Sequence, residues 1–96
     1  NRIVHEYKTA NIGYWIRSNF TGRSLAVTAV KALARFAFDE LAMTRLEIVA
    51  MEKNLRSRRV AEKSGAVDEG LHRNRLYLQG KPIDAWVYSL IPSDLA

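Results

Sequence analysis

The chain has 96 residues, of which 48% are hydrophobic and 26% charged, and its formal net charge is +5. These proportions are those of one ordinary globular domain and exclude a disordered or low-complexity chain. The lack of cysteine excludes disulfides, thiolate catalysis and cysteine-ligated zinc. No apolar run approaches the roughly 20 residues that span a bilayer, so we expect no membrane partner and a cytoplasmic location.

The first half of the chain predicts a strand, a loop and a long helix. Aromatic and branched residues predict the strand over residues 10–16, and turn-forming residues predict a loop over 18–24. Apolar residues spaced by three and four predict a helix over 25–41, with Ser24 as its N-cap residue. This helix is apolar over so much of its circumference that we expect it to pack against a sheet.

The second half predicts a strand, a short helix and a hairpin. These elements are expected at residues 45–50, at 54–64 with Gly65 ending the helix, and at 67–78 and 83–90 with a turn at 79–81. The element order is therefore strand, helix, strand, helix, strand, strand. The first three elements predict a right-handed crossover with parallel strands, and the last two an antiparallel hairpin. The expected fold class is α/β with a mixed sheet.

The first candidate site is the junction between the loop and the long helix. The N–H groups that begin a helix have no intrahelical partner, and the helix dipole adds partial positive charge. Gly22 allows an anion to approach the backbone closely, and Arg23 adds a full charge. The junction is therefore either a phosphate or pyrophosphate site or a simple strand–helix turn. It matches neither a Walker A motif nor a dinucleotide fingerprint, so ATP and NAD are disfavoured.

The second candidate site is the short helix, which is rich in basic residues. These residues are Lys53, Arg56, Arg58, Arg59 and Lys63. They predict either a ribose-phosphate contact or a solvated helix face, and the lack of interleaved aromatic residues makes nucleic acid an unfavoured partner.

The polar residues of the chain offer few further candidates. Asn54 and Ser57 lie one helical turn apart and can face the same groove, although Asn54 is equally an N-cap candidate. No carboxylate is spaced to join His5 or His72 in a metal site, so we expect no metal.

Four segments in this order resemble the GNAT superfamily of acetyltransferases, specifically its RimJ/RimL branch, which acetylates protein N-termini. The segments are IGYWI at 12–16, FTGRSLAVTAVKALARFAF at 20–38, RLEIVAMEKNLRSRRVAEKSG at 45–65 and EGLHRNRLYLQGKPIDAWVYSL at 69–90. The resemblance implies a single GNAT-like domain over residues 1–96, without the first strand, two helices and two further strands of that fold. An uncovered edge on the 12–16 strand would then favour a homo-oligomer.

The resemblance also implies a cofactor and its contacts. In that family the amides of Gln/Arg-x-x-Gly-x-Gly/Ala bind the coenzyme A pyrophosphate, and residues 19–24 read NFTGRS, in which Gly22 matches. The implied contacts of acetyl-CoA are Ile16, Asn19, Thr21, Gly22, Arg23, Ser24, Leu25 and Asn54.

The implied reaction is direct acetyl transfer to a primary amine, with a protein N-terminus as one acceptor. A strand amide near Ile16 or Arg17 would polarise the thioester carbonyl, and Ser57 matches the serine that can protonate the departing thiolate. The position that is a glutamate in some relatives is Leu76 here, which leaves Glu47 and Glu52 as candidate bases. Two alternatives stay open: a non-catalytic GNAT-derived binding or assembly module, and a basic nucleic-acid binder.

Overall fold

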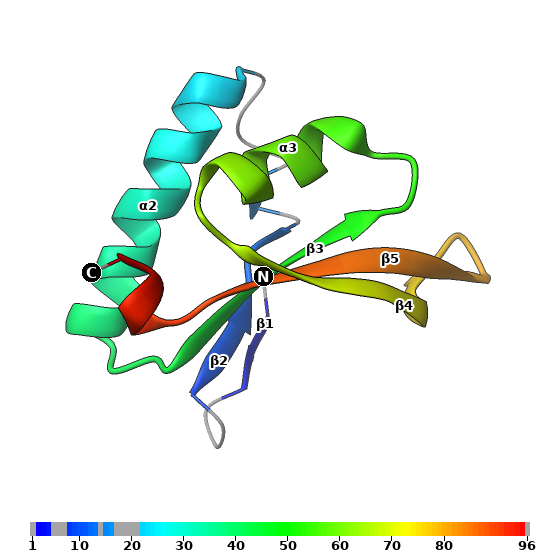
Figure 1. Cartoon of the computed structure of the whole chain (residues 1–96). Coiled ribbons are helices and arrows are strands. Elements are labelled where there is room, and N and C mark those ends of the chain that lie inside the picture. The colour runs from blue at the N-terminus through cyan, green and yellow to red at the C-terminus, as the bar shows by residue number, and fades with distance from the viewer. Residues whose placement is uncertain (1, 5–7, 14, 17–21, 96) are drawn as a thin grey trace.

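The computed structural model describes residues 2–4, 8–13, 15–16 and 22–95. Its elements are β1 (Arg2–Val4), β2 (Thr9–Asn11), α2 (Arg23–Asp39), β3 (Arg45–Met51), α3 (Leu55–Lys63), β4 (Val67–Leu78), β5 (Lys81–Leu90) and the 3₁₀ helix η1 (Pro92–Leu95). The strands form one five-stranded sheet in the order β1-β2-β3-β5-β4 (Figure 1).

The sheet is mixed, as predicted. Strands β2 and β3 pair in parallel and are joined by α2, whereas β5 lies between β3 and β4 and is antiparallel to both. The predicted order of strand, helix, strand, helix, strand, strand is confirmed from β2 onward. The expectation of an uncovered edge is wrong at β2, because β1 pairs with it antiparallel over residues 9–11. The backbone groups of β2 find partners on both sides, so this strand is not an open edge.

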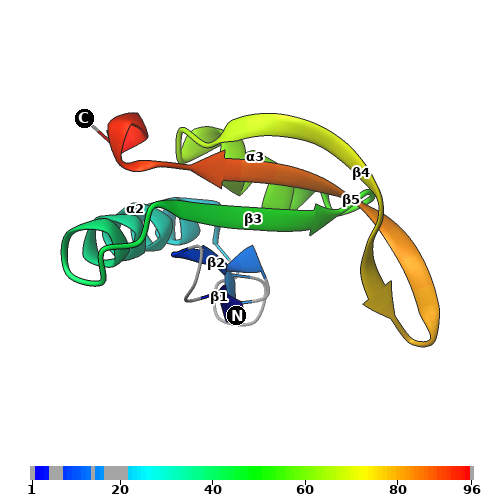
Figure 2. The same cartoon turned by 90° about the horizontal axis from the view of Figure 1, so that it is seen from below.

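Both helices cover the same face of the sheet (Figures 1 and 2). The main core lies between these layers, because side chains spaced by three and four on α2 meet alternate side chains of β3 and β5. Its fully buried members are Val30, Ala34, Leu46, Ile48, Val60, Ala61, Tyr88 and Leu90. A smaller cluster on the opposite face joins Val49, Ala85 and Val87. Among the described residues, no helix has the length and apolarity needed to cross a membrane.

The predicted strand over residues 10–16 is wrong beyond its first two residues. Strand β2 ends at Asn11, and Trp15 and Ile16 are helical, with the Ile16 N–H donating to the Ile12 carbonyl at 3.1 Å. Ile12 and Ile16 are buried, and Trp15 packs against the same core. A helical turn places such residues on one side, whereas a strand would direct Trp15 away from the other two.

The start of helix α2 also differs from the prediction. The helix runs from Arg23 to Asp39, and its N-cap residue is Gly22, not Ser24. Gly22 has the extended backbone of an N-cap, with φ −95° and ψ 133°, and no side chain caps the helix. Ser24 lies inside the first turn, where its carbonyl accepts a hydrogen bond from the Thr28 hydroxyl at 3.1 Å.

The second half of the chain follows the predictions closely. Strand β3 is confirmed with one more residue, and α3 is confirmed with Gly65 in the left-handed region at φ 87°. The hairpin turn is confirmed at Gln79 and Gly80, whose φ angles are 50° and 77°. Strand β5 begins at Lys81, two residues earlier than predicted.

The long edge strand β4 is irregular at two places. Its register with β5 shifts between Asp68 and Leu71 and again between His72 and Leu76. Gly70 and Asn74 occupy these shifts with φ angles of 95° and 53°, which is typical of β-bulges. Bulges bend a strand and increase its twist, so the hairpin of β4 and β5 curves away from the rest of the sheet (Figure 2).

Candidate functional site

The first turn of α2 is open to solvent. The first intrahelical bond runs from the Ala26 N–H to the Gly22 carbonyl at 3.0 Å, so the preceding amides have no acceptor within the helix. The turn contains no acidic residue, and a Cβ built on Gly22 would meet no atom within 4 Å. Ser24 and Leu25 are exposed. Among the described residues, the sequence-predicted anion site therefore has backbone donors without an intrahelical acceptor, and no atom of these residues would meet a Cβ built on Gly22 within 4 Å.

Several predicted cofactor contacts lie outside this description. Asn19 and Thr21 are among the residues that the structure does not describe, and only the backbone of Arg23 is described. Ile16 is described, but its N–H already donates to Ile12 and its side chain is buried. In this conformation the Ile16 amide cannot polarise a thioester carbonyl as the resemblance implied.

Helix α3 begins with a well-formed cap. The Asn54 side-chain oxygen accepts from the Ser57 N–H at 3.1 Å, and the Asn54 N–H donates to the Met51 carbonyl at 2.9 Å. Ser57 lies on the inner face of the helix with 4% of its surface exposed. The N-cap interpretation of Asn54 is confirmed, whereas the expectation that Ser57 faces a groove beside it is not met, because the Ser57 side chain is buried.

An apolar groove adjoins this cap. No pattern in the sequence predicted this groove. It consists of two neighbouring hollows of about 550 Å³ and about 430 Å³ that share Met51 and Ile83. The remaining lining residues are Glu52, Lys53 and Asn54 in the first hollow and Leu78, Gln79, Lys81 and Pro82 in the second. The end of β3, the residues that lead into α3 and the hairpin of β4 and β5 form its walls.

Glu47 is already paired with two arginines, which makes it a poor candidate for the general base. Its carboxylate accepts from Arg45 at 2.9 Å and from Arg75 at 2.8 Å. Arg45 also binds Glu69 at 2.7 Å, and the Ser89 hydroxyl donates to Glu69 at 2.7 Å. Both carboxylate oxygens of Glu47 thus already accept hydrogen bonds within the fold, Oε2 from Arg45 and Oε1 from Arg75. Of the two candidate bases, only Glu52 lines the groove.

The same cluster makes stability depend on pH. Hydrogen bonds from Arg45 and then Ser89 lower the pKa of Glu69 to about 2, from an ordinary value of 4.5. A carboxylate with a lowered pKa stabilises the folded state above its unfolded pKa, and this contribution is lost as the pH falls. We expect the free energy of unfolding to fall by about 1 kcal/mol from this pair between pH 4.5 and pH 2, since solvent screens a side chain that is one-third exposed.

Urea unfolding at several pH values measures this effect. In Glu69→Gln, the unfolding free energy should no longer show the fall at acid pH that this ion pair contributes. Arg45→Gln should remove the same contribution. The double variant should then add little to either single variant. Equal acid slopes in the wild type and Glu69→Gln would show that the ion pair carries no stability.

Arg58 is engaged within the fold through its Nε and the face of its guanidinium group. Its guanidinium lies 4.0 Å from the centroid of the Trp86 ring, and its Nε donates to the Tyr88 hydroxyl at 3.1 Å. That hydroxyl donates in turn to Glu62 at 3.1 Å. Burial raises the pKa of Tyr88, which keeps the hydroxyl protonated as a donor. Arg58, the central residue of the basic helix face predicted from the sequence, therefore packs against Trp86 within the fold.

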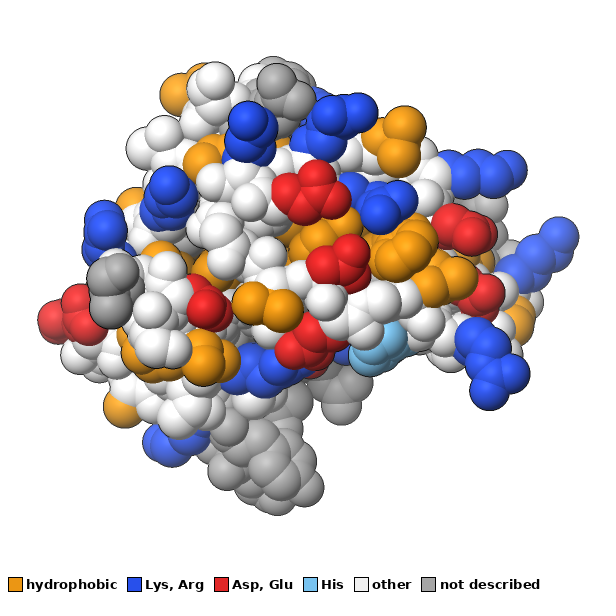
Figure 3. All heavy atoms as spheres, viewed as in Figure 1, with side chains coloured by type: hydrophobic (Ala, Val, Ile, Leu, Met, Phe, Trp, Pro, Cys, Tyr) orange, Lys and Arg blue, Asp and Glu red, His pale blue; other side chains and the backbone are white. Residues whose placement is uncertain are grey.

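On the face seen in Figure 3, the described basic side chains do not form one continuous surface. Figure 3 shows acidic side chains among the lysines and arginines on the face that carries the helices. A nucleic-acid interface needs a basic stripe that follows the phosphate backbone. This face of the molecule does not offer such a stripe.

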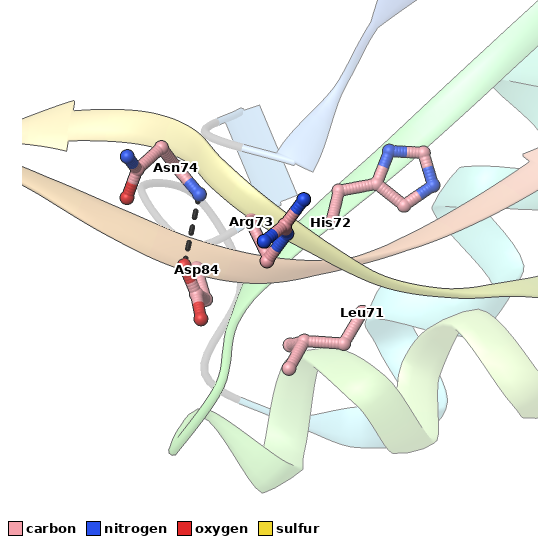
Figure 4. Close-up of a pocket in the computed structure, with 5 residues that line it drawn as sticks. All are labelled: Leu71, His72, Arg73, Asn74 and Asp84. Carbon is pink, nitrogen blue, oxygen red and sulfur yellow. Dashed lines mark hydrogen bonds between the residues drawn. The ribbon is translucent and has the colours of Figure 1, made fainter.

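A further hollow of about 680 Å³ lies at the second bulge of β4. It is lined by Leu71, His72, Arg73, Asn74 and Asp84 (Figure 4). The Asn74 N–H donates to Asp84 at 2.8 Å, which stabilises the left-handed backbone of the bulge. Leu71 and His72 leave the strand in opposite directions. In the described ranges, no group of three histidine or acidic side chains is placed to hold a metal ion.

These features define a mixed α/β domain with a solvent-exposed helix N-terminus at its parallel crossover. Residues 1–67 match the family model described as "Acetyltransferase (GNAT) domain". The chain belongs to the GNAT acetyltransferase family, in agreement with the resemblance of its four segments.

Named relatives in this family share both sequence and fold with the chain. The Bacillus subtilis protein "Putative ribosomal N-acetyltransferase YdaF" is 39% identical over 84 residues, covering 88% of this chain and 46% of that protein. The ribosomal-protein-serine acetyltransferase of Escherichia coli is 30% identical over 91 residues, covering 95% of this chain and 51% of that protein. The chain spans about half the length of these relatives.

One similar structure contains the family's cofactor. The crystal structure of the microcin C7 self immunity acetyltransferase MccE is a complex with acetyl-CoA and AMP. It matches this chain with a TM-score of 0.75 and 30% identity, over 95% of this chain and 51% of that one.

Proposed function

We propose that this chain is the cofactor-binding part of an acetyl-CoA-dependent N-acetyltransferase that transfers acetyl to a primary amine. The observation that carries the proposal is the uncapped first turn of α2, where Gly22 leaves the amides accessible. A diphosphate matches such a turn in charge and in its number of acceptor oxygens. The relatives named for ribosomal proteins favour a protein N-terminus as the acceptor.

The other proposed contacts follow from this placement. Because the Asn54 oxygen is occupied by the cap, its side-chain NH₂ is the group that donates to the pantetheine arm. Ser57, one turn further along, is the proposed donor of the proton that the departing thiolate takes up. The acceptor amine, as the free base, attacks the thioester carbonyl directly: the C–N bond forms, the C–S bond breaks, and the proton that the nitrogen loses replaces the one that Ser57 gives to the thiolate.

Calorimetry with acetyl-CoA and with acetyl-pantetheine tests the proposal. Acetyl-pantetheine lacks the diphosphate, so we expect it to bind at least 100-fold more weakly than acetyl-CoA. In a coupled thiol-release assay, Ser57→Ala should lower kcat and leave the dissociation constant of acetyl-CoA unchanged. No binding of acetyl-CoA at millimolar concentration would reject the proposal.

A non-catalytic binding module is the second candidate function. The pairing of Glu47 with Arg45 and Arg75 favours it, because both oxygens of this candidate base already accept hydrogen bonds within the fold. Binding of acetyl-CoA without turnover of peptides, polyamines or aminoglycosides distinguishes this candidate from the enzyme.

A further inference from the structure

The groove beside Asn54 has the size and lining of a small-molecule pocket. Its two hollows measure about 550 Å³ and about 430 Å³, within the range of roughly 300–1,000 Å³ that is usual for ligand sites. Met51 and Ile83 are half-buried and shared by both hollows, and Leu78 and Pro82 extend the apolar surface. A ligand that fills the groove must therefore present an apolar group.

The backbone explains why these side chains meet. Met51 pairs with Ala85 at the end of β3, and Ile83 lies two residues before Ala85 on the same face of β5. Leu76 pairs with Ile83, and the turn that follows brings Leu78 and Lys81 together. The groove thus rests on regular sheet pairing, which holds its walls in place.

The charges around the groove favour a ligand with few positive charges. One carboxylate, Glu52, lies in the same hollow as one ammonium group, Lys53, and a second ammonium group, Lys81, lies in the adjoining hollow. A single ammonium group can approach Glu52 while its apolar substituent covers Met51 and Ile83. A polyamine would place several positive charges against a rim that is already net positive, and like charges there repel.

We infer that this groove selects the acceptor: it takes a singly charged amine with an apolar side chain beside the nitrogen, and it rejects polyamines. The inference rests on the proposed function, because Asn54 is the point where the groove meets the proposed cofactor arm. Met51 and Ile83 are the residues that determine this specificity. They contact the acceptor and take no part in the transfer step.

Methionine-methyl NMR on the 96-residue chain tests the inference. The chain has two methionines, so Met51 reports on the groove and Met43, which is buried in the main core, serves as an internal control. The probes are leucyl-glycyl-glycine amide, triglycine amide and spermidine. We expect the leucyl peptide to shift the Met51 methyl but not the Met43 methyl, and to bind about tenfold more tightly than triglycine amide. Spermidine should bind more weakly than either peptide.

Two matched variants test whether the preference for the leucyl peptide arises in the groove. Ile83→Ala should reduce the affinity of the leucyl peptide to that of triglycine amide. Ile91→Ala, at an exposed residue beyond the end of β5, should leave both affinities unchanged. Equal binding of the two peptides, tighter binding of spermidine, or no shift at Met51 would each overturn the inference.

The two proposals fail in different ways. Acetyl-CoA added to the same sample is followed at the Asn54 backbone amide. If acetyl-CoA shifts this amide resonance but peptide does not shift the Met51 methyl resonance, the inference about the groove is rejected and the proposed cofactor site is retained. The absence of an amide shift on adding acetyl-CoA rejects the cofactor site itself.

Discussion

Gly22→Asp is expected to stabilise the fold and at the same time to weaken acetyl-CoA binding about 30- to 100-fold. An aspartate at the N-cap accepts from the open first-turn amides and complements the helix dipole, which should raise the free energy of unfolding by about 0.5–1 kcal/mol. Its backbone and side chain fit, because Gly22 has φ −95° and a Cβ there meets no neighbour. The same carboxylate occupies the donors that a diphosphate needs and repels its charge.

Gly22→Asn is the matched control, since asparagine caps equally well and carries no charge. It should stabilise the fold to a similar extent and lower the affinity less than tenfold. Urea unfolding and calorimetry with acetyl-CoA measure the two effects separately. If Gly22→Asp binds acetyl-CoA as tightly as the wild type, the first turn of α2 does not hold the diphosphate.

Gly13→Ala is expected to lower the free energy of unfolding by about 2–3 kcal/mol, because the added methyl collides with main-chain atoms. A Cβ on Gly13 would lie 2.6 Å from the Val49 carbonyl oxygen and 3.1 Å from the Val49 nitrogen. Val49 is at the centre of a paired strand and cannot move without breaking ladder bonds. The Asn11 side chain, which accepts from the Gly13 N–H at 2.9 Å, holds Gly13 in this position.

Gly65→Ala is the control for a general cost of replacing glycine. At Gly65 a Cβ meets no atom within 4 Å, but φ is 87°, so the expected cost is about 1 kcal/mol from the backbone alone. Urea unfolding of both variants measures the difference. Equal destabilisation would show that the close approach of Gly13 to Val49 contributes nothing.

Gly22 and Gly13 show which features of a structure can be predicted from the sequence and which cannot. The place of Gly22 between a loop and an amphipathic helix predicts either a phosphate site or a simple strand–helix turn, because that argument needs only local backbone rules. Nothing around Gly13 predicted its contact with Val49, which lies 36 residues further along the chain. The same limit explains why IGYWI was assigned to a strand: the type of residue was counted, while the core that buries Ile12, Trp15 and Ile16 together was not visible.

The parallel crossover, the turn at Gly80 and the family could be predicted from the sequence, and so could a helix cap at Asn54 as one of two alternatives. Each of these follows from a short-range pattern, since periodicity, capping and turn chemistry act over only a few residues. Only the folded chain shows that Arg75 pairs with Glu47, that Arg58 covers Trp86, and that Met51 and Ile83 line one apolar groove. These contacts join residues some 28 positions or more apart in the chain, and no local pattern specifies which distant partners the folded backbone brings together.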